Sequence, residues 1–267
     1  MPLVSRVMSP TDPRHRTGPQ EIPRPPSHRL GGDAPWAHLG VDVRSSVRLD
    51  AVVSAVLSRD RTGDAGTVAT EVSEFSRSFA DAFPDANPAA VLVALFEDEG
   101  EARVLLTVRS ARLRSHQGEV AFPGGKLDRG EGIEEGALRE AQEEVGLDPT
   151  SVQVVGHLTA MPTVSSNTLM TPVVAVLDGR PVTSPAPDEV SRVFDVALAD
   201  LLADGVFAEE LWAVPGRHGA DGQPGGEFPV WFFSVAGETV WGATARVLTE
   251  LLCLVLDVAG PSRPARR

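Results

Sequence analysis

Residues 125–147 read GKLDRGEGIEEGALREAQEEVGL, and this stretch predicts the centre of the fold. On a helix over about 133–145, with about 100° per residue, three carboxylates share one arc of about 100°. They are Glu140, Glu143 and Glu144. A separate apolar arc holds Leu138, Ala141 and Val145. The helix is therefore expected to bury one side in a core, to turn carboxylates to another side, and to end at a left-handed Gly146.

The three carboxylates indicate a metal site. Like charges within a few ångströms repel one another, and a hard divalent cation removes that cost. Oxygen donors at this spacing suit Mg²⁺ or Mn²⁺, which also bind phosphate oxygens. Arg139 is placed to neutralise one carboxylate, and Glu131, at the head of the helix, could reach Arg139 or the helix N-terminus. An isolated E-x-x-E-E is more often a solvated helix face, so the wider pattern has to decide.

The wider pattern is G-x5-E-x7-R-E-U-x-E-E-x-G-U, where U is aliphatic. Its fixed positions are Gly125, Glu131, Arg139, Glu140, Glu143, Glu144 and Gly146. The segment resembles the Nudix box, with Ala141 smaller than the usual aliphatic residue. The resemblance implies an α/β fold, the Nudix-type α/β/α sandwich with a mixed β-sheet, and hydrolysis of a nucleoside diphosphate linked to another group, with Mg²⁺ or Mn²⁺. It also implies that Glu140 and Glu144 are metal ligands, that Glu143 is a third ligand or a partner of one, that Arg139 assists, and that Gly125 shapes the loop before the helix.

A basic stretch lies directly upstream. Residues 102–118 contain Arg103, Arg109, Arg112 and Arg114 and no acidic residue. Guanidinium groups suit bidentate contacts with phosphate, and His116 adds a donor whose charge can change near neutral pH. The alternative is a set of surface arginines that balance acidic neighbours.

The order of residues 105–125, LLTVRSARLRSHQGEVAFPGG, narrows the substrate. It resembles the signature of coenzyme A diphosphatases within the Nudix family. The fixed positions are Leu105, Leu106, Thr107, Arg109, Ser110, Arg114, Gly118, Phe122, Pro123, Gly124 and Gly125. The resemblance implies hydrolysis of coenzyme A or its thioesters to 3′,5′-ADP and 4′-phosphopantetheine or its acyl derivative. Its substrate-binding candidates are Arg109, Arg112, Arg114, His116, Gly124 and Gly125.

Two other functions stay open. One is a Nudix diphosphatase for another nucleotide, such as ADP-ribose, NADH or a damaged dNTP. The other is a ligand-sensing Nudix module without catalysis, against which the intact carboxylates argue. The general base is also open, because Nudix enzymes place it variably. Glu189, in the PDEV segment before a predicted strand, is our candidate. Glu143 and a water activated by the metal alone are the alternatives, so the catalytic set is Glu143, Arg139 and Glu189.

The rest of the chain predicts three parts. Residues 1–35 are rich in proline and arginine and are expected to form a disordered leader. Residues 36–259 form the hydrolase domain, and 260–267 a basic tail. Within the domain we expect helices in 47–83 and at 243–257, a hairpin of strands 91–96 and 104–108, further strands at 152–158, 172–177, 211–214 and 230–235, and a Gly-rich loop at 216–226.

Composition limits the partners. The net charge is −13 although both ends are basic, so the body repels polyanions and a nucleic-acid-binding surface is not expected. Cys253 is the single cysteine, which excludes a disulfide scaffold and a cysteine-based zinc site. The longest apolar stretch, 247–259, is interrupted by Glu250 and Asp257, so no membrane span is expected. The expected setting is cytoplasmic, with a small nucleotide substrate, and a homodimer is compatible with the sequence.

Overall fold

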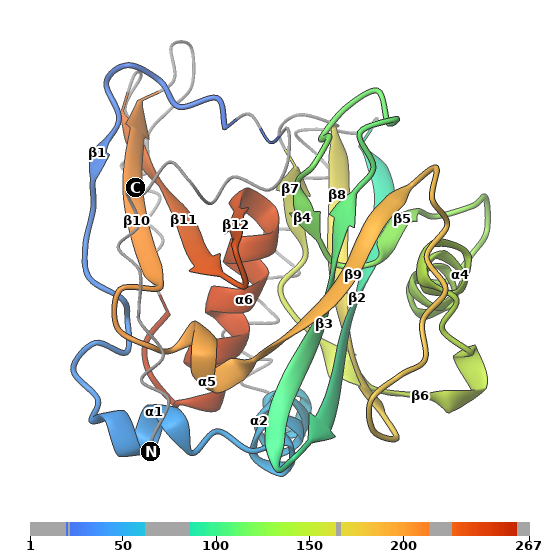
Figure 1. Cartoon of the computed structure of the whole chain (residues 1–267), viewed down its shortest axis with the longest axis horizontal. Coiled ribbons are helices and arrows are strands. Elements are labelled where there is room, and N and C mark those ends of the chain that lie inside the picture. Colours follow the sequence, from blue (N-terminus) through green and yellow to red (C-terminus); the bar gives the residue numbers. More distant parts are fainter. Residues whose placement is uncertain (1–19, 21, 62–85, 164–166, 214–225, 261–267) are drawn as a thin grey trace.

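The computed structural model describes residues 20, 22–61, 86–163, 167–213 and 226–260. Two sheets and the helices around them form layers (Figure 1). Helix α4 (Ile133–Val145) covers one face of the larger sheet, and helix α6 (Gly242–Val255) lies between that sheet and the smaller one. The α/β/α sandwich with a mixed sheet, expected from the sequence, is therefore confirmed.

The larger sheet is mixed because β2 and β8 run parallel while the other strand pairs are antiparallel. Its strands are β2 (Asn87–Asp98), β3 (Glu101–Arg109), β4 (Val120–Ala121), β5 (Gly124–Lys126), β6 (Val152–His157), β7 (Met161–Thr163), β8 (Thr168–Leu177) and β9 (Val190–Ala197). The predicted hairpin is β2–β3. Its turn has positive φ at Glu99 (51°) and Gly100 (80°), the conformation that favours tight hairpin turns. A short 3₁₀ turn, η3 (Pro149–Ser151), leads from α4 to β6.

Two partners follow one another along one edge of β2. β3 pairs with Leu95–Asp98 near the hairpin turn, and β5 pairs with Ala89–Val91 near the start of the strand. The far half of β3 therefore leaves β2 and pairs with β4, while β9 pairs with β3 from Arg103 to Arg109. At this end of the sheet, three segments come together: the basic stretch after β3, the glycines before α4 and the turn before β9.

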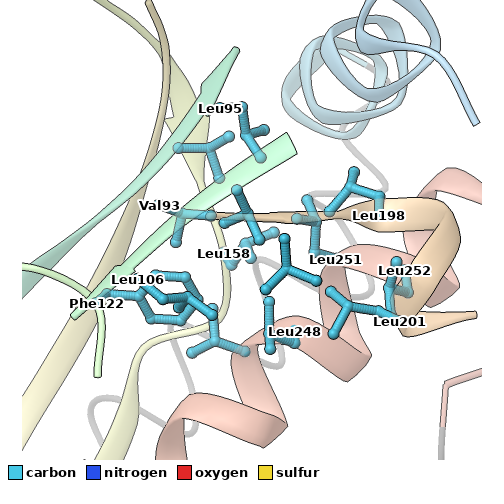
Figure 2. Close-up of a cluster of buried hydrophobic side chains, with 14 of the residues drawn as sticks. Val93, Leu95, Leu106, Phe122, Leu158, Leu198, Leu201, Leu248, Leu251 and Leu252 are labelled. Atoms are coloured by element: carbon cyan, nitrogen blue, oxygen red, sulfur yellow. The ribbon is translucent and has the colours of Figure 1, made fainter. Parts of the chain in front are cut away.

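The two faces of β2 bury two cores, because side chains alternate along a strand. Val93 and Leu95 point to one side, where Leu106 of β3 and leucines of α5 (Leu198–Leu201) and α6 pack with them (Figure 2). The opposite side packs against α4 through Ala90, Leu92, Ala94 and Phe96. Ala137 and Ala141 of α4 are fully buried there, and their small side chains let the helix lie close to the sheet.

The smaller sheet is antiparallel and contains β1 (Arg29–Leu30), β10 (Phe207–Ala213), β11 (Glu227–Val235) and β12 (Glu238–Trp241). The strands expected at 211–214 and 230–235 are found as the longer β10 and β11, which pair with each other. A separate second sheet is not predicted by the sequence pattern. The helix expected at 243–257 is α6. Among the described residues, no helix has the length and apolarity needed to cross a bilayer.

The N-terminal expectations need a correction. Residues 22–35 were expected to be disordered, but β1 pairs with β10, and Arg24 forms an ion pair with Glu210 at 2.8 Å. Edge pairing and ion pairs place this proline-rich segment although it has no core of its own. Within the helical region expected at 47–83, the structure describes α2 (Leu49–Arg61). A short helix, α1 (Val41–Ser45), precedes it. Residues 1–19, 62–83 of the expected helices, most of the loop 216–226 and the tail from 261 lie outside the described residues.

Candidate active site

Strand β5, which begins with Gly124 and Gly125, lies beside α4 (Figure 1). A Cβ atom on Gly125 would lie 2.5 Å from Cδ of Glu140, so any other residue here would displace that carboxylate. Gly124 has a φ of +151°, and a Cβ there would lie 2.4 Å from the carbonyl oxygen of Ala90. Its N–H instead donates to Oε2 of Glu144 at 3.0 Å. The glycines before the helix therefore bring the backbone against two of the predicted ligands.

Glu144 is the most deeply buried carboxylate of the site, with 4% of its surface exposed. Its pKa is raised to about 7, chiefly by burial, and the neighbouring carboxylates Glu140 and Glu189 act in the same direction. The Gly124 N–H and Arg109, whose Nη1 lies 3.9 Å from Oε1, act in the opposite direction. A carboxylate that is costly to ionise in this way is stabilised by any added positive charge.

Arg139 connects the other carboxylates of α4. Its Nε lies 2.7 Å from Glu131, and its Nη1 lies 3.0 Å from both Glu140 and Glu143. Its Nη2 also donates to the carbonyl oxygen of Lys126 at 3.1 Å. The hydrogen bond from Arg139 lowers the pKa of Glu131, whereas burial raises the pKa of Glu140 despite the same arginine. Arg139 therefore ties the helix to the loop that precedes it.

The three carboxylates of the predicted arc do not share one environment. Glu140 and Glu144 lie on the buried side, near Glu189, whose charge raises the pKa of both. The Glu143 side chain is 59% exposed and is held by Arg139. In the described part of the chain, no three His, Cys, Asp or Glu side chains converge as a ready metal site.

The basic stretch forms a loop whose two ends are pinned together. The N–H of Arg109 donates to the carbonyl oxygen of Glu119 at 2.9 Å, and the N–H of Gly118 donates to that of Arg109 at 3.1 Å. Arg109 reaches Glu144, and its buried Nε has no hydrogen-bond partner among the described residues. His116 has a positive φ of 58° and pairs with Glu119 at 3.0 Å, which raises the pKa of the imidazole.

The other arginines of the stretch differ from one another. Arg112 forms an exposed ion pair with Asp188 at 2.6 Å. Arg114 is exposed. Arg103 does not belong to this loop, although the sequence groups it with the others. It pairs with Glu101 and Asp195 near the opposite end of β3, about 20 Å away along the strand. The basic cluster therefore consists of Arg109, Arg112, Arg114 and His116.

Sequence reasoning missed the partners of this loop. Glu119 follows His116 by three residues, and that spacing was a usable signal. Asp188 is distant in the sequence from Arg112 and carries no local signal, because tertiary contacts alone bring them together. The backbone of Glu189 contacts the basic loop, because the N–H of Ser110 donates to the Glu189 carbonyl oxygen at 2.8 Å.

Comparison with known proteins adds a family. The model of the NUDIX domain matches residues 86–213. The chain is 38% identical over 165 residues to the uncharacterized Nudix hydrolase NudL of Citrobacter koseri, covering 61% of this chain and 80% of that protein. It is 44% identical over 133 residues to the peroxisomal coenzyme A diphosphatase of Mus musculus, covering 49% and 56% of the two chains.

A third relative is Nudix hydrolase 22 of Arabidopsis thaliana, a chloroplastic protein, which is 39% identical over 178 residues, covering 62% of this chain and 55% of that one. Against several curated relatives, the mouse and Arabidopsis proteins included, the chain spans about half of their length. The match to the family model therefore includes the larger sheet, α4 and both motifs. It ends at residue 213.

Proposed function

This chain belongs to the Nudix hydrolase family, and we propose that it hydrolyses the diphosphate of coenzyme A or of its thioesters to 3′,5′-ADP and 4′-phosphopantetheine or its acyl derivative. One observation carries this proposal. Arg109 of the basic loop lies 3.9 Å from the buried Glu144 of α4, so a phosphate-binding group and a carboxylate suited to metal stand in contact. The similarity to a relative named as a coenzyme A diphosphatase supports the same substrate.

The charges of the loop suit a substrate with more than one phosphate. Arg109 lies beside the carboxylates and is placed to contact the diphosphate, where its fork of donors stabilises charge on the phosphoryl oxygens. Arg112 is already paired with Asp188. Arg114 lies further along the same exposed loop, and we assign it to the 3′-phosphate of coenzyme A.

The donor set fits a hard divalent cation. Glu140 and Glu144 offer only oxygen atoms, both have raised pKa values, and Gly125 leaves space beside Glu140 that a Cβ would fill. Glu140 and Glu144 would hold Mg²⁺ or Mn²⁺, with Glu143 as a further candidate. When bound, such a cation supplies Lewis-acid stabilisation of phosphoryl charge and lowers the pKa of a water.

The chain's own residues supply the remaining chemistry. A water oxygen forms a bond to one phosphorus atom while the bridging P–O bond breaks. Glu189, whose charge acts on both Glu140 and Glu144, takes the proton of that water in our assignment. Glu143 is the weaker candidate for the base because it is bound to Arg139. Arg139 orients Glu140 through their 3.0 Å contact.

A substrate panel tests the proposal. Coenzyme A, acetyl-CoA, NADH, ADP-ribose and 8-oxo-dGTP are each incubated with Mg²⁺ and with Mn²⁺, and the products are separated by chromatography. We expect preferential release of 3′,5′-ADP from coenzyme A or acetyl-CoA. Preference for another nucleotide would reject the coenzyme A assignment and retain diphosphate hydrolysis. Absence of turnover from a folded protein would support a ligand-sensing module instead.

Arg114→Ala tests the contact with the 3′-phosphate. The KM for coenzyme A should rise about tenfold, the value expected for a lost charge-assisted contact, while the KM for 3′-dephospho-coenzyme A should change by less than about twofold. Arg103→Ala is the matched control, because Arg103 comes from the same stretch of sequence but lies at the far end of β3. Equal effects of Arg114→Ala on both substrates would remove the assignment.

A further inference from the structure

A short turn before β9 joins the two halves of the site. The N–H groups of Glu189 and Val190 both donate to the carbonyl oxygen of Ala186, at 3.0 and 2.8 Å. The N–H of Ala186 donates in turn to the carbonyl oxygen of Glu144 at 2.9 Å. The turn that carries Glu189 is therefore anchored on one side to the end of α4.

Ser110 anchors the other side of the same turn. Its hydroxyl donates to the carbonyl oxygen of Pro187 at 3.2 Å, and its N–H donates to that of Glu189 at 2.8 Å. The hydroxyl also accepts the N–H of Arg112 at 3.3 Å. Only 4% of Ser110 is exposed, so these bonds are shielded from competing water.

The pairing of β3 with β9 is irregular at the same place. Val108 is opposite Arg192 and Arg109 is opposite Val190, which leaves Ser191 as an extra residue. A bulge of this kind changes the direction in which the following side chains point and occurs often beside active sites. Here Val190 is buried at 2% exposure, whereas the adjacent Glu189 is exposed.

We propose that Ser110 is a positioning residue for the reaction: its hydroxyl, by holding the carbonyl group of Pro187, keeps the turn in place and with it the Glu189 carboxylate beside Glu140 and Glu144. This inference rests on the proposed function, in which Glu189 takes a proton from water. The second link between the two segments, Arg112 to Asp188, has side chains 71% and 83% exposed. Such a pair contributes little, so the buried contacts of Ser110 hold the turn.

A double-mutant cycle tests the inference. Ser110→Ala should lower kcat by about 10- to 100-fold, the loss expected when a catalytic group is displaced by about an ångström, with KM changed by less than about twofold. In the Glu189→Gln background the same substitution should lower kcat by less than about twofold, because the group that Ser110 positions is already absent. An equal loss in both backgrounds, or no loss in the wild type, would overturn the proposal.

Ser191→Ala is the matched control. The Ser191 hydroxyl also donates to a backbone carbonyl, that of Val108 at 3.0 Å, but this bond lies within the paired strands and does not hold the turn. We expect kcat within about twofold of the wild type, since the backbone ladder holds these strands. A loss equal to that of Ser110→Ala would show that any hydroxyl in this region matters and would overturn the specific role of Ser110.

A second measurement does not depend on the substrate. Amide hydrogen exchange of the peptide 186–192, in the intact protein without added ligand, should be faster in Ser110→Ala than in the wild type or in Ser191→Ala. Unchanged exchange would overturn the positioning role even if the panel identifies another nucleotide as substrate. If the panel fails for coenzyme A and exchange still increases, the proposed function is wrong and the link from Ser110 to the turn stands.

Discussion

Strands β3 and β9 carry an arginine–carboxylate network at each end, and the two networks behave in opposite ways. At the end near the hairpin turn, Asp195 contacts Arg103 and Arg180, and Arg180 also contacts Asp98. Burial acts to raise the pKa of Asp195, but the hydrogen bonds from the two arginines outweigh it, and the pKa is lowered. At the other end, Arg109 at 3.9 Å is the one arginine paired with Glu144 among the residues that the structure describes, and the pKa of Glu144 is raised to about 7.

The difference is one of charge balance. Asp195 is in direct contact with two arginines, Arg103 and Arg180, so its charge is compensated by folding alone, which is the usual condition of a structural ion-pair network. Glu144 has one arginine, Arg109, at 3.9 Å, while the charges of Glu140 and Glu189 oppose its ionisation, and both Glu140 and Glu144 are partly or wholly removed from water. An imbalance that folding alone does not favour indicates a site whose missing charge comes from a ligand.

Of the substitutions that test this difference, Glu144→Gln should have the largest effect on activity. Glutamine keeps an oxygen that can accept the Gly124 N–H, but it removes the charge that would hold the cation. Metal-dependent hydrolysis should fall by more than about a hundredfold, since even indirect changes at metal sites cost about 10- to 100-fold. The measurement is kcat with saturating Mg²⁺ and Mn²⁺, with the melting temperature as a check on folding. Activity retained within tenfold would show that Glu144 is not a ligand.

The sequence predicts the site better than it predicts the surroundings of the site. The helix over 133–145 is amphipathic, and its carboxylates, its buried alanines and its end at Gly146 (φ +71°) are all local properties that periodicity can show. The exposure of Glu143 could not be predicted in this way. Side chains within an arc of about 100° on a helix can face the sheet or point into solvent. Only the packing of the helix on the sheet decides which of them are buried.

Two other differences have the same origin. Arg103 and Arg109 stand close in the sequence, but an extended strand separates them by about 20 Å, so a count of charges along the chain merges two distant places. Residues 22–35 have the composition of a disordered segment, and their structure depends on β10, Glu210 and other partners that lie far away in the chain. Composition indicates whether a segment can fold by itself. The order of residues 22–35 depends instead on long-range contacts, which composition does not show.

The pH dependence of folding stability separates the Glu144 site from the Asp195 network further. A carboxyl group whose pKa is raised by folding holds its proton longer in the folded state than in the unfolded state. Between the ordinary pKa of 4.5 and about 7, Glu144 therefore makes the folded state lose stability as pH rises. In the metal-free protein, the wild type should lose about 3 kcal/mol relative to Glu144→Gln across this range, at 1.36 kcal/mol per pKa unit.

Urea unfolding of both proteins at pH 5, 6, 7 and 8, with a chelator present, measures this difference. Saturating Mg²⁺ should reduce it, because a cation bound to the folded state favours the ionised carboxylate. A wild-type curve parallel to that of the variant would contradict the raised pKa.

Asp195→Asn tests the balanced network and should have the smallest effect on activity. Asparagine keeps one acceptor for Arg103 and Arg180, each of which also retains another carboxylate, Glu101 or Asp98. We expect a loss of about 1 to 2 kcal/mol in unfolding free energy at pH 7 and a kcat within about twofold of the wild type, because Asp195 lies about 15 Å along β9 from the turn of Glu189.

The pH dependence of this variant should be opposite in sign to that of Glu144→Gln. The pKa of Asp195 is lowered by folding, so its contribution is present above the ordinary value of 3.8 and is lost as the pH falls through the lowered pKa. The wild type should therefore lose its advantage over Asp195→Asn only in strong acid, whereas its disadvantage against Glu144→Gln develops as the pH rises to 7. Two variants with the same direction of pH dependence would show that charge balance does not separate the two ends, and the raised pKa of Glu144 would then carry no information about a ligand.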